Sequence, residues 1–148
     1  MQKVYGFDTL QIHAGWRGDP ATGAHAAPLY QTSAYLFESA EDAAAQFRGE
    51  APGSIYTRIK NPSVTMLEER VCALENGYAT ICFASGTAAL LALALNLCEP
   101  GDELVAFSAL YGGSYALLFE ELEHRYGVRA RRVEPEDAEG LKAAINDK

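Results

Sequence analysis

Hydrophobic residues recur at helical spacing along the segment that begins at Asn61. Asn61 suits an N-cap, and Pro62 suits the first position of a helix. Apolar residues then return every three or four positions as far as Leu74, with charged residues between them. Gly77 is placed to end the helix at the C′ position. The pattern therefore predicts a helix from residue 62 to the neighbourhood of Gly77.

Apolar strands and helices alternate through the rest of the chain. We predict strands at 80–84, 103–107 and 128–133, and helices at 87–97, 114–126 and from near 136 to 145. Gly127 should close the second of these helices. The 87–97 helix has almost no polar face, so we expect it to be covered on most sides. Alternation of this kind predicts βαβ units and a mainly parallel sheet, which is an α/β fold.

Residues 1–60 have a different character, with much Gly, Ala, Pro and Thr and weak periodicity. The one helix predicted there is short, from Ser39 to Phe47, with Ser39 as N-cap and Glu41 and Asp42 in the first turn. The remainder is expected to be an extended arm that lies on the main body or on a partner subunit.

Composition narrows the function. The chain has 148 residues, is 49% hydrophobic and carries a formal net charge of −8. These values predict a globular domain with a core, and they argue against nucleic acid as the partner. The longest apolar run, 88–95, is too short to span a membrane, and the N-terminus lacks the apolar region of a signal peptide. The basic group at 129, 131 and 132 is expected on a solvated strand edge.

The three cysteines, Cys72, Cys82 and Cys98, lie in apolar runs without metal-ligand spacing. We expect buried free thiols, no metal site and, from the odd count, a reducing cytoplasmic location. His13 and His25 lie in loop-like sequence and are expected to be surface or hydrogen-bonded residues.

Tyr56 and Arg58 are the first candidates for binding a ligand. In an extended segment their spacing would place both side chains on one face. A guanidinium beside a hydroxyl is suited to holding a phosphate. The alternative is a half-exposed strand on which Arg58 makes a surface ion pair.

Two loops at the carboxyl ends of predicted strands are further candidates, because such loops hold ligands in α/β folds. Ser85-Gly86-Thr87 opens a helix and offers free backbone N–H groups to an anion, although a glycine there also serves packing. Tyr111-Gly112-Gly113 would lay an aromatic face on a planar ligand, or simply bury an aromatic side chain. Neither the glycine-rich dinucleotide motif nor a P-loop occurs.

In combination and in this order, the motifs resemble those of the Cys/Met-metabolism family of pyridoxal-5′-phosphate enzymes. The resemblance covers nearly the whole chain and rests on the following segments: 8–10, 13–15, 19–20, 28–33, 56–62, 67–68, 74–77, 84–86, 101–102 and 110–113. The version with Tyr-Thr-Arg-Ile most resembles the O-acetylhomoserine sulfhydrylases. The resemblance implies a fold-type I transferase architecture, in which this chain is an N-terminal arm plus the first part of a mainly parallel three-layer sheet domain.

The resemblance also implies a role for each candidate residue. Tyr56 and Arg58 would bind the cofactor phosphate in the neighbouring subunit, and the backbone N–H groups of Gly86 and Thr87 would bind the phosphate of their own subunit. Tyr111 would stack on the pyridine ring and is the candidate for catalytic proton transfer. Thr87 stands where the family usually has Met, which should matter little because the backbone does the binding.

One element of the family is missing. The lysine that holds the cofactor covalently lies in a Ser-x-Thr-Lys segment, and Lys3, Lys60, Lys142 and Lys148 do not sit in that context. We therefore expect the N-terminal portion of a longer enzyme, with residues 1–60 reaching a neighbouring subunit's site and residues 61–148 forming an incomplete cofactor-binding domain.

The expected parent is a cytoplasmic transferase of transsulfuration and methionine biosynthesis that acts on a small amino-acid substrate. It would be a homotetramer built as a dimer of dimers, with no nucleic-acid or membrane partner. A cystathionine γ-synthase, a γ-lyase of the same family and a non-catalytic fragment remain the alternatives.

Overall fold

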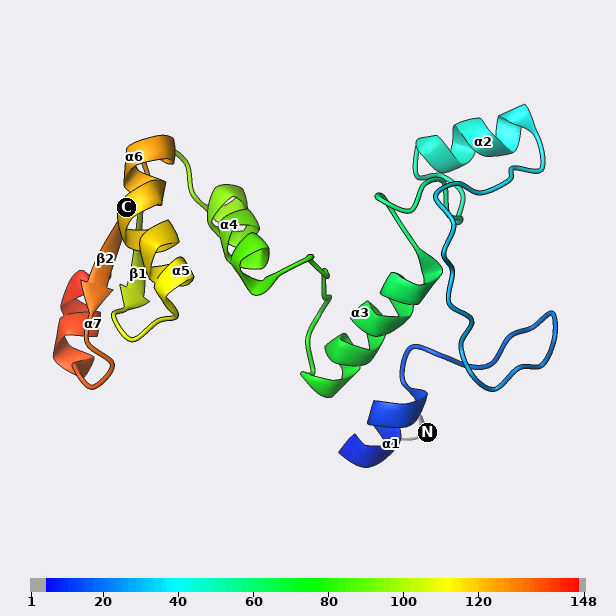
Figure 1. The fold of residues 1–148 in the computed structure, drawn as a ribbon, viewed down its shortest axis with the longest axis horizontal. Helices are drawn as coiled ribbons and strands as arrows, with labels where there is room; N and C mark the ends of the chain where they lie inside the picture. Colours follow the sequence, from blue (N-terminus) through cyan, green and yellow to red (C-terminus); the bar gives the residue numbers. More distant parts are fainter. Residues whose placement is uncertain (1–4, 147–148) are drawn as a thin grey trace. The chain divides into compact units, whose positions relative to one another are not determined.

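The computed structural model describes residues 5–146 and divides into two compact units, Met1–Cys82 and Phe83–Lys148 (Figure 1). Lys3 and Lys148 lie outside the described residues. The assignment of 1–60 to a neighbouring subunit's site and of 61–148 to a cofactor-binding domain stays a prediction.

The first unit contains helices α1 (Phe7–His13), α2 (Ala40–Phe47) and α3 (Pro62–Leu74). The predicted cap of α2 is confirmed, because the hydroxyl oxygen of Ser39 accepts a hydrogen bond from the backbone N–H of Asp42 at 3.1 Å. Helix α1 was not predicted within the extended arm. It packs against α3. The chain just after α1 comes close to α3 at Gly15, whose φ is +73°. A Cβ on Gly15 would lie 2.4 Å from the carbonyl oxygen of Met66.

The end of α3 differs from the prediction. The helix stops at Leu74, and the left-handed residue after it is Asn76, with φ of 51°, rather than Gly77. Asn is one of the few non-glycine residues that enter this region at low cost. The backbone N–H of Gly77 then donates to the carbonyl oxygen of Cys72 at 2.9 Å.

The second unit begins with helix α4 (Gly86–Leu97) and strand β1 (Glu103–Phe107). A continuous helical stretch follows, made of α5 (Gly112–Ala116), the π-helical turn η1 (Leu117–Glu121) and α6 (Leu122–Tyr126). Strand β2 (Arg129–Val133) and helix α7 (Ala138–Ala144) complete the unit. Gly127 closes α6 in the left-handed conformation, as predicted, with φ of 70°.

Strands β1 and β2 pair in parallel, with Glu103 opposite Arg129 and Phe107 opposite Val133. The parallel pairing predicted for an α/β fold is therefore confirmed for strands β1 and β2. The strand expected at 80–84 is wrong, since no described strand pairs with this segment. The backbone N–H of Cys82 instead donates to the carboxylate of Glu68 at 2.9 Å.

The core of the second unit lies between the helices and the sheet. Its buried residues are Ala94, Leu118, Leu122 and Val128, and partly buried Leu104 and Ala106 of β1 pack against them. Helix α4 is less covered than predicted, because within this chain Leu93, Leu95 and Leu97 are all exposed. The apolar surface of α4 therefore exceeds what the sheet and helices of this unit bury.

Several expectations from composition are resolved. The three cysteines are free thiols, but all are half-buried rather than buried. The arginines of β2 are solvated and pair locally, with Arg129 contacting Glu123 at 3.1 Å and Arg131 contacting Glu103 at 2.8 Å. None of the helices in residues 5–146 combines the length and the apolar character needed to cross a bilayer.

Candidate functional site

Tyr56 and Arg58 lie in a turn rather than in the extended segment that was predicted. Tyr56 makes an isolated antiparallel bridge with Ala34 and is followed by turn residues. Its carbonyl oxygen accepts hydrogen bonds from the N–H groups of Ile59, at 2.8 Å, and Lys60, at 3.0 Å. The turn still brings the two side chains together, with the Arg58 guanidinium carbon 5.5 Å from the centre of the Tyr56 ring. This cation–π contact orients the guanidinium.

The alternative of a surface ion pair at Arg58 is not what the structure contains. Arg58 is exposed and, among residues 5–146, makes no ion pair or hydrogen bond with a carboxylate. Tyr56 is 41% exposed. The phenol and the guanidinium are therefore both available to an incoming anion.

Thr57 and Asn61 hold the turn in place. The backbone N–H of Thr57 donates to the carbonyl oxygen of Ser33 at 2.9 Å, and its hydroxyl donates to the carbonyl oxygen of Thr32. The Asn61 side chain is buried and donates to the Thr57 hydroxyl oxygen, at 3.1 Å, and to the carbonyl oxygen of Tyr30, at 2.9 Å. The 30–34 segment and the start of α3 thus fix the backbone that carries Tyr56 and Arg58.

Asn61 also begins helix α3. Its side-chain oxygen accepts from the backbone N–H of Ser63 at 2.8 Å, so one buried amide caps the helix and clamps the turn. Asn61 was predicted to act as a helix cap, and no role was predicted for Thr57. The Asn-Pro pair immediately after Tyr-Thr-Arg was the available signal.

The second group of candidates lies at the N-terminus of α4. The Ser85 hydroxyl oxygen caps the helix by accepting from the N–H of Ala88 at 3.1 Å. The N–H groups of Gly86 and Thr87 precede the first intrahelical bond and find no partner in the described part of the chain. Gly86 and Thr87 are exposed, and a Cβ built on Gly86 would meet nothing within 4 Å.

Tyr111 precedes helix α5 and is 78% exposed. Its ring lies close to Gly113, where an added Cβ would come within 2.8 Å of a ring carbon. The alternative of a buried aromatic is therefore wrong, and the exposed ring has a face free for stacking. Gly113 gives that ring room.

Tyr56 and Arg58 belong to the first unit, whereas Gly86, Thr87 and Tyr111 belong to the second. The structure brings together the residues of the first pair. In the second unit, α4 and α5 contact each other, so the two loops that begin these helices belong to packed elements. Arg58 with Tyr56, and the backbone N–H groups of Gly86 and Thr87, are chemically suited to binding phosphate. The Tyr111 ring is suited to stacking on an aromatic ring.

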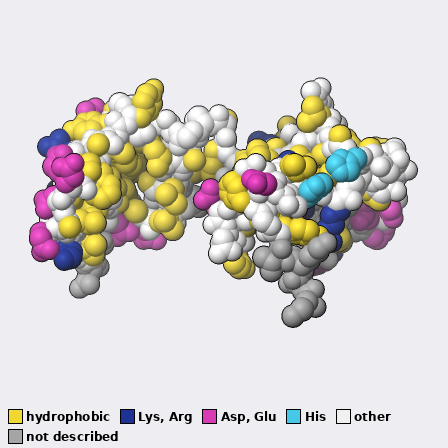
Figure 2. Space-filling model, turned by 90° about the horizontal axis from the view of Figure 1, so that it is seen from below, with side chains coloured by type: hydrophobic (Ala, Val, Ile, Leu, Met, Phe, Trp, Pro, Cys, Tyr) yellow, Lys and Arg dark blue, Asp and Glu magenta, His cyan; other side chains and the backbone are white. Residues whose placement is uncertain are grey.

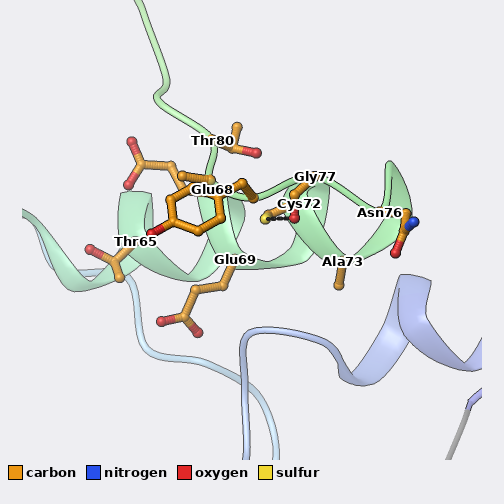
Figure 3. Close-up of a pocket in the computed structure, with 10 residues that line it drawn as sticks. Thr65, Glu68, Glu69, Cys72, Ala73, Asn76, Gly77 and Thr80 are labelled. Carbon is orange, nitrogen blue, oxygen red and sulfur yellow. Dashed lines mark hydrogen bonds between the residues drawn. The ribbon is translucent and has the colours of Figure 1, made fainter.

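A cavity of about 450 Å³ lies at the C-terminal half of α3 (Figure 3). It is lined by Glu68, Glu69 and Cys72 among others. The Cys72 thiol donates to the carbonyl oxygen of Gly77 at 3.1 Å, and Glu68 accepts from the N–H of Cys82. These contacts fold the 77–82 segment back on α3, and none of the predicted ligand-binding residues lines the cavity.

Comparison with known proteins identifies one family. Residues 8–148 match the model of the Cys/Met metabolism PLP-dependent enzymes. An O-acetyl-L-homoserine sulfhydrylase of Leptospira meyeri is 43% identical over 141 residues, which is 95% of this chain and 32% of that protein. An L-methionine gamma-lyase of Pseudomonas deceptionensis is 41% identical and matches 97% of this chain and 36% of its own length.

A solved structure of a similarly described protein also matches this chain. The crystal structure of a protein described as an O-acetylhomoserine (thiol)-lyase from Campylobacter jejuni, with N′-pyridoxyl-lysine-5′-monophosphate, has a TM-score of 0.88 and 32% identity. It covers 97% of this chain, which covers 35% of that one. The chain therefore spans about a third of the length of the relatives it matches.

Proposed function

Because the chain belongs to the Cys/Met-metabolism family of pyridoxal-phosphate-dependent enzymes, we propose that it forms the phosphate-holding part of an O-acetylhomoserine sulfhydrylase. The proposed reaction converts O-acetyl-L-homoserine and sulfide into L-homocysteine and acetate. The observation that carries the proposal is the Arg58 guanidinium, which is held beside Tyr56 and is free of carboxylates in the described chain.

The residues of this chain fit the cofactor. Arg58 has the planar fork that binds two phosphate oxygens, and Tyr56 adds a hydroxyl donor. Gly86 and Thr87 offer backbone N–H groups at the start of a 12-residue helix. Pyridoxal phosphate, when bound, supplies an electron sink for chemistry at the carbons of an amino-acid substrate.

Each group has a distinct proposed role. Arg58 and Tyr56 anchor the phosphate, in the site of a neighbouring subunit, and Gly86 and Thr87 anchor it in their own. Tyr111 positions the pyridine ring by stacking, and its phenolic oxygen carries a proton during the reaction. The homo-oligomer that this sharing requires is proposed as a dimer of dimers, in the cytoplasm.

A γ-lyase is the second candidate, because an L-methionine gamma-lyase is nearly as similar to this chain as a sulfhydrylase. Two chimaeras separate the candidates. In each, this chain replaces the matching segment of one relative, either the Leptospira sulfhydrylase or the Pseudomonas lyase. Homocysteine formation and methanethiol release are then measured against the intact parent.

We expect the sulfhydrylase chimaera to keep kcat/KM within about tenfold of its parent and the lyase chimaera to lose more than about a hundredfold. The reverse order would favour the lyase. Loss of both activities in folded chimaeras that bind no cofactor would favour a non-catalytic fragment. The chain alone should form no homocysteine, because none of its lysines has the required context; turnover above about 1 per second would contradict this.

Sharing of sites between subunits has its own test in the sulfhydrylase chimaera. Subunits carrying Arg58→Ala are mixed with subunits whose cofactor lysine is removed. If Arg58 serves the partner's site, one site of each hybrid dimer carries both defects and the other site carries neither, so activity returns. Hybrids without any activity would contradict a shared site.

A further inference from the structure

A basic cavity lies in the first unit, and neither Tyr56 nor Arg58 lines it. Its volume is about 560 Å³, within the range of small-molecule sites. Four basic side chains line it: His13, Arg17, His25 and Arg70. No Asp or Glu lines this cavity in the part of the chain that the structure describes.

Hydrogen bonds fix the walls of this cavity. Arg70 donates through Nε to the carbonyl oxygen of Ala14 at 2.8 Å, which anchors its guanidinium beside the end of α1. The Trp16 indole N–H donates to the carbonyl oxygen of His25 at 2.7 Å. The rings of His13 and His25 meet edge to face, with their centres 5.9 Å apart. The fold thus gathers the four basic groups around one cavity, with Arg70 half-buried and the other three residues exposed.

The charges of the cluster are poorly compensated. Arg17 makes no ion pair or hydrogen bond within residues 5–146. The carboxylate of Glu69 lines an adjoining cavity of about 320 Å³ together with His13 and Arg17. Figure 2 shows histidine side chains lying together beside basic side chains on one face of the molecule.

We propose that this cavity binds a small oxyanion of the phosphate or sulfate class, either free or as the ester of a small metabolite. Guanidinium groups match tetrahedral oxyanions in geometry and charge, and each imidazole offers at least one N–H donor. Neither Tyr56 nor Arg58 lines the cavity, so the proposal does not rest on the cofactor site.

Trp16 makes the proposal directly testable, because it is the only tryptophan of the chain and it lines the cavity. Inorganic phosphate is titrated into the 148-residue chain at constant ionic strength, with potassium chloride as the reference, while tryptophan fluorescence is recorded. We expect a saturable change with Kd below about 1 mM. Glycerol 3-phosphate is titrated in parallel. Tighter binding of glycerol 3-phosphate than of inorganic phosphate would indicate that the natural ligand is an ester, and weaker binding would indicate the free anion.

Variants assign the binding to the cavity. Arg17→Gln should weaken phosphate binding at least about tenfold, and Arg17→Lys should weaken it less. Arg48→Gln is the matched control, because Arg48 lies in the same unit and pairs with Glu50 at the surface. It should bind phosphate like the parent. Far-UV circular dichroism establishes that each variant is folded, and His25→Gln replaces Arg17→Gln if the latter is not.

The proposal is overturned if the fluorescence response to phosphate equals the response to chloride. It is equally overturned if folded Arg17→Gln binds phosphate as tightly as Arg48→Gln. Loss of cofactor binding through Arg58 would leave both results unchanged, so failure of the proposed enzymatic function and failure of this site are distinguishable.

Discussion

The buried amide of Asn61 donates a hydrogen bond to the hydroxyl oxygen of Thr57 at 3.1 Å. Through this pair the first turn of α3 is joined to the turn that carries Tyr56 and Arg58. The position of the proposed phosphate-binding side chains therefore depends on residues that would not themselves touch the phosphate.

Replacing Asn61 with Ala should destabilise the first unit by about 1–3 kcal/mol, because a helix cap and two partly buried hydrogen bonds are lost. Asn61→Asp keeps the acceptor for Ser63 but removes the donors to Tyr30 and Thr57. Its cofactor affinity in the sulfhydrylase chimaera should fall even where the helix is retained. Urea unfolding and cofactor titration measure the two effects.

Asn96→Ala is the control for these variants, because within residues 5–146 the exposed Asn96 amide on α4 bonds only to the carbonyl oxygen of Ala92. It should change stability by less than about 0.5 kcal/mol. An Asn61→Ala variant as stable as Asn96→Ala would contradict the role of the clamp.

Gly15 should be the least replaceable glycine of the first unit. Gly15→Ala places a Cβ against the carbonyl oxygen of Met66 and also strains a left-handed backbone, at a cost of roughly 2–5 kcal/mol. Gly23 has nearly the same φ, +71°, but open space around it, so Gly23→Ala should cost only about 1–2 kcal/mol. Equal unfolding free energies for the two variants would refute the packing of α1 on α3.

Glu103 makes stability depend on pH. Hydrogen bonds donated by Asn146, which has the larger effect, and by Arg131 hold the pKa of this carboxyl below its usual value of 4.5. A folded-state pKa lower than the unfolded one contributes stability above the unfolded pKa, and this contribution disappears as pH falls through the folded pKa. Glu103→Gln should therefore lower the melting temperature at pH 7 and converge with the parent below pH 4.

The control is Glu139→Gln, which removes an exposed carboxylate paired with Lys142 on α7. Glu139→Gln should lower the melting temperature at pH 7 by less than Glu103→Gln does. A gap between Glu103→Gln and the parent that stays constant from pH 7 to pH 3 would show that the pairing of Glu103 contributes nothing.

The exposed leucines of α4 should promote self-association of the isolated chain. Leu93 and Leu97 are 57% and 74% exposed on a helix with no charged residue. Sedimentation velocity at micromolar concentration should show dimers or larger species, and Leu93→Gln with Leu97→Lys should shift them toward monomer. A parent chain that sediments as a monomer would contradict this prediction.

The sequence predicted those elements whose boundaries are set by local chemistry. Ser39 and Asn61 cap helices where expected, and Gly127 ends one, because caps and left-handed residues act through neighbouring backbone groups. The strand at 80–84 failed because a strand needs a partner, and its N–H at Cys82 is taken by Glu68. Helix α1 was missed because its packing depends on Gly15 fitting against α3, which is 50 residues away in sequence and invisible to periodicity.

The candidate residues were predictable by type, but their geometry was not. Tyr56 and Arg58 were expected to share a face because the segment was expected to be extended, whereas a turn brings them together. The bonds that impose this turn come from residues 30–33, more than 20 positions earlier. Contacts of that range follow from tertiary folding and not from local pattern.

The affinity of the sulfhydrylase chimaera for pyridoxal phosphate, with and without Arg58→Lys, tests the central claim most directly. A guanidinium makes two parallel bonds to phosphate oxygens, whereas an ammonium acts as a point charge. We predict that Arg58→Lys weakens binding by roughly tenfold to a hundredfold, equivalent to about 1.5–3 kcal/mol, and that Arg48→Lys leaves it unchanged. Absorbance titration of the apo proteins gives both values. Equal dissociation constants for Arg58→Lys and the parent would contradict the account.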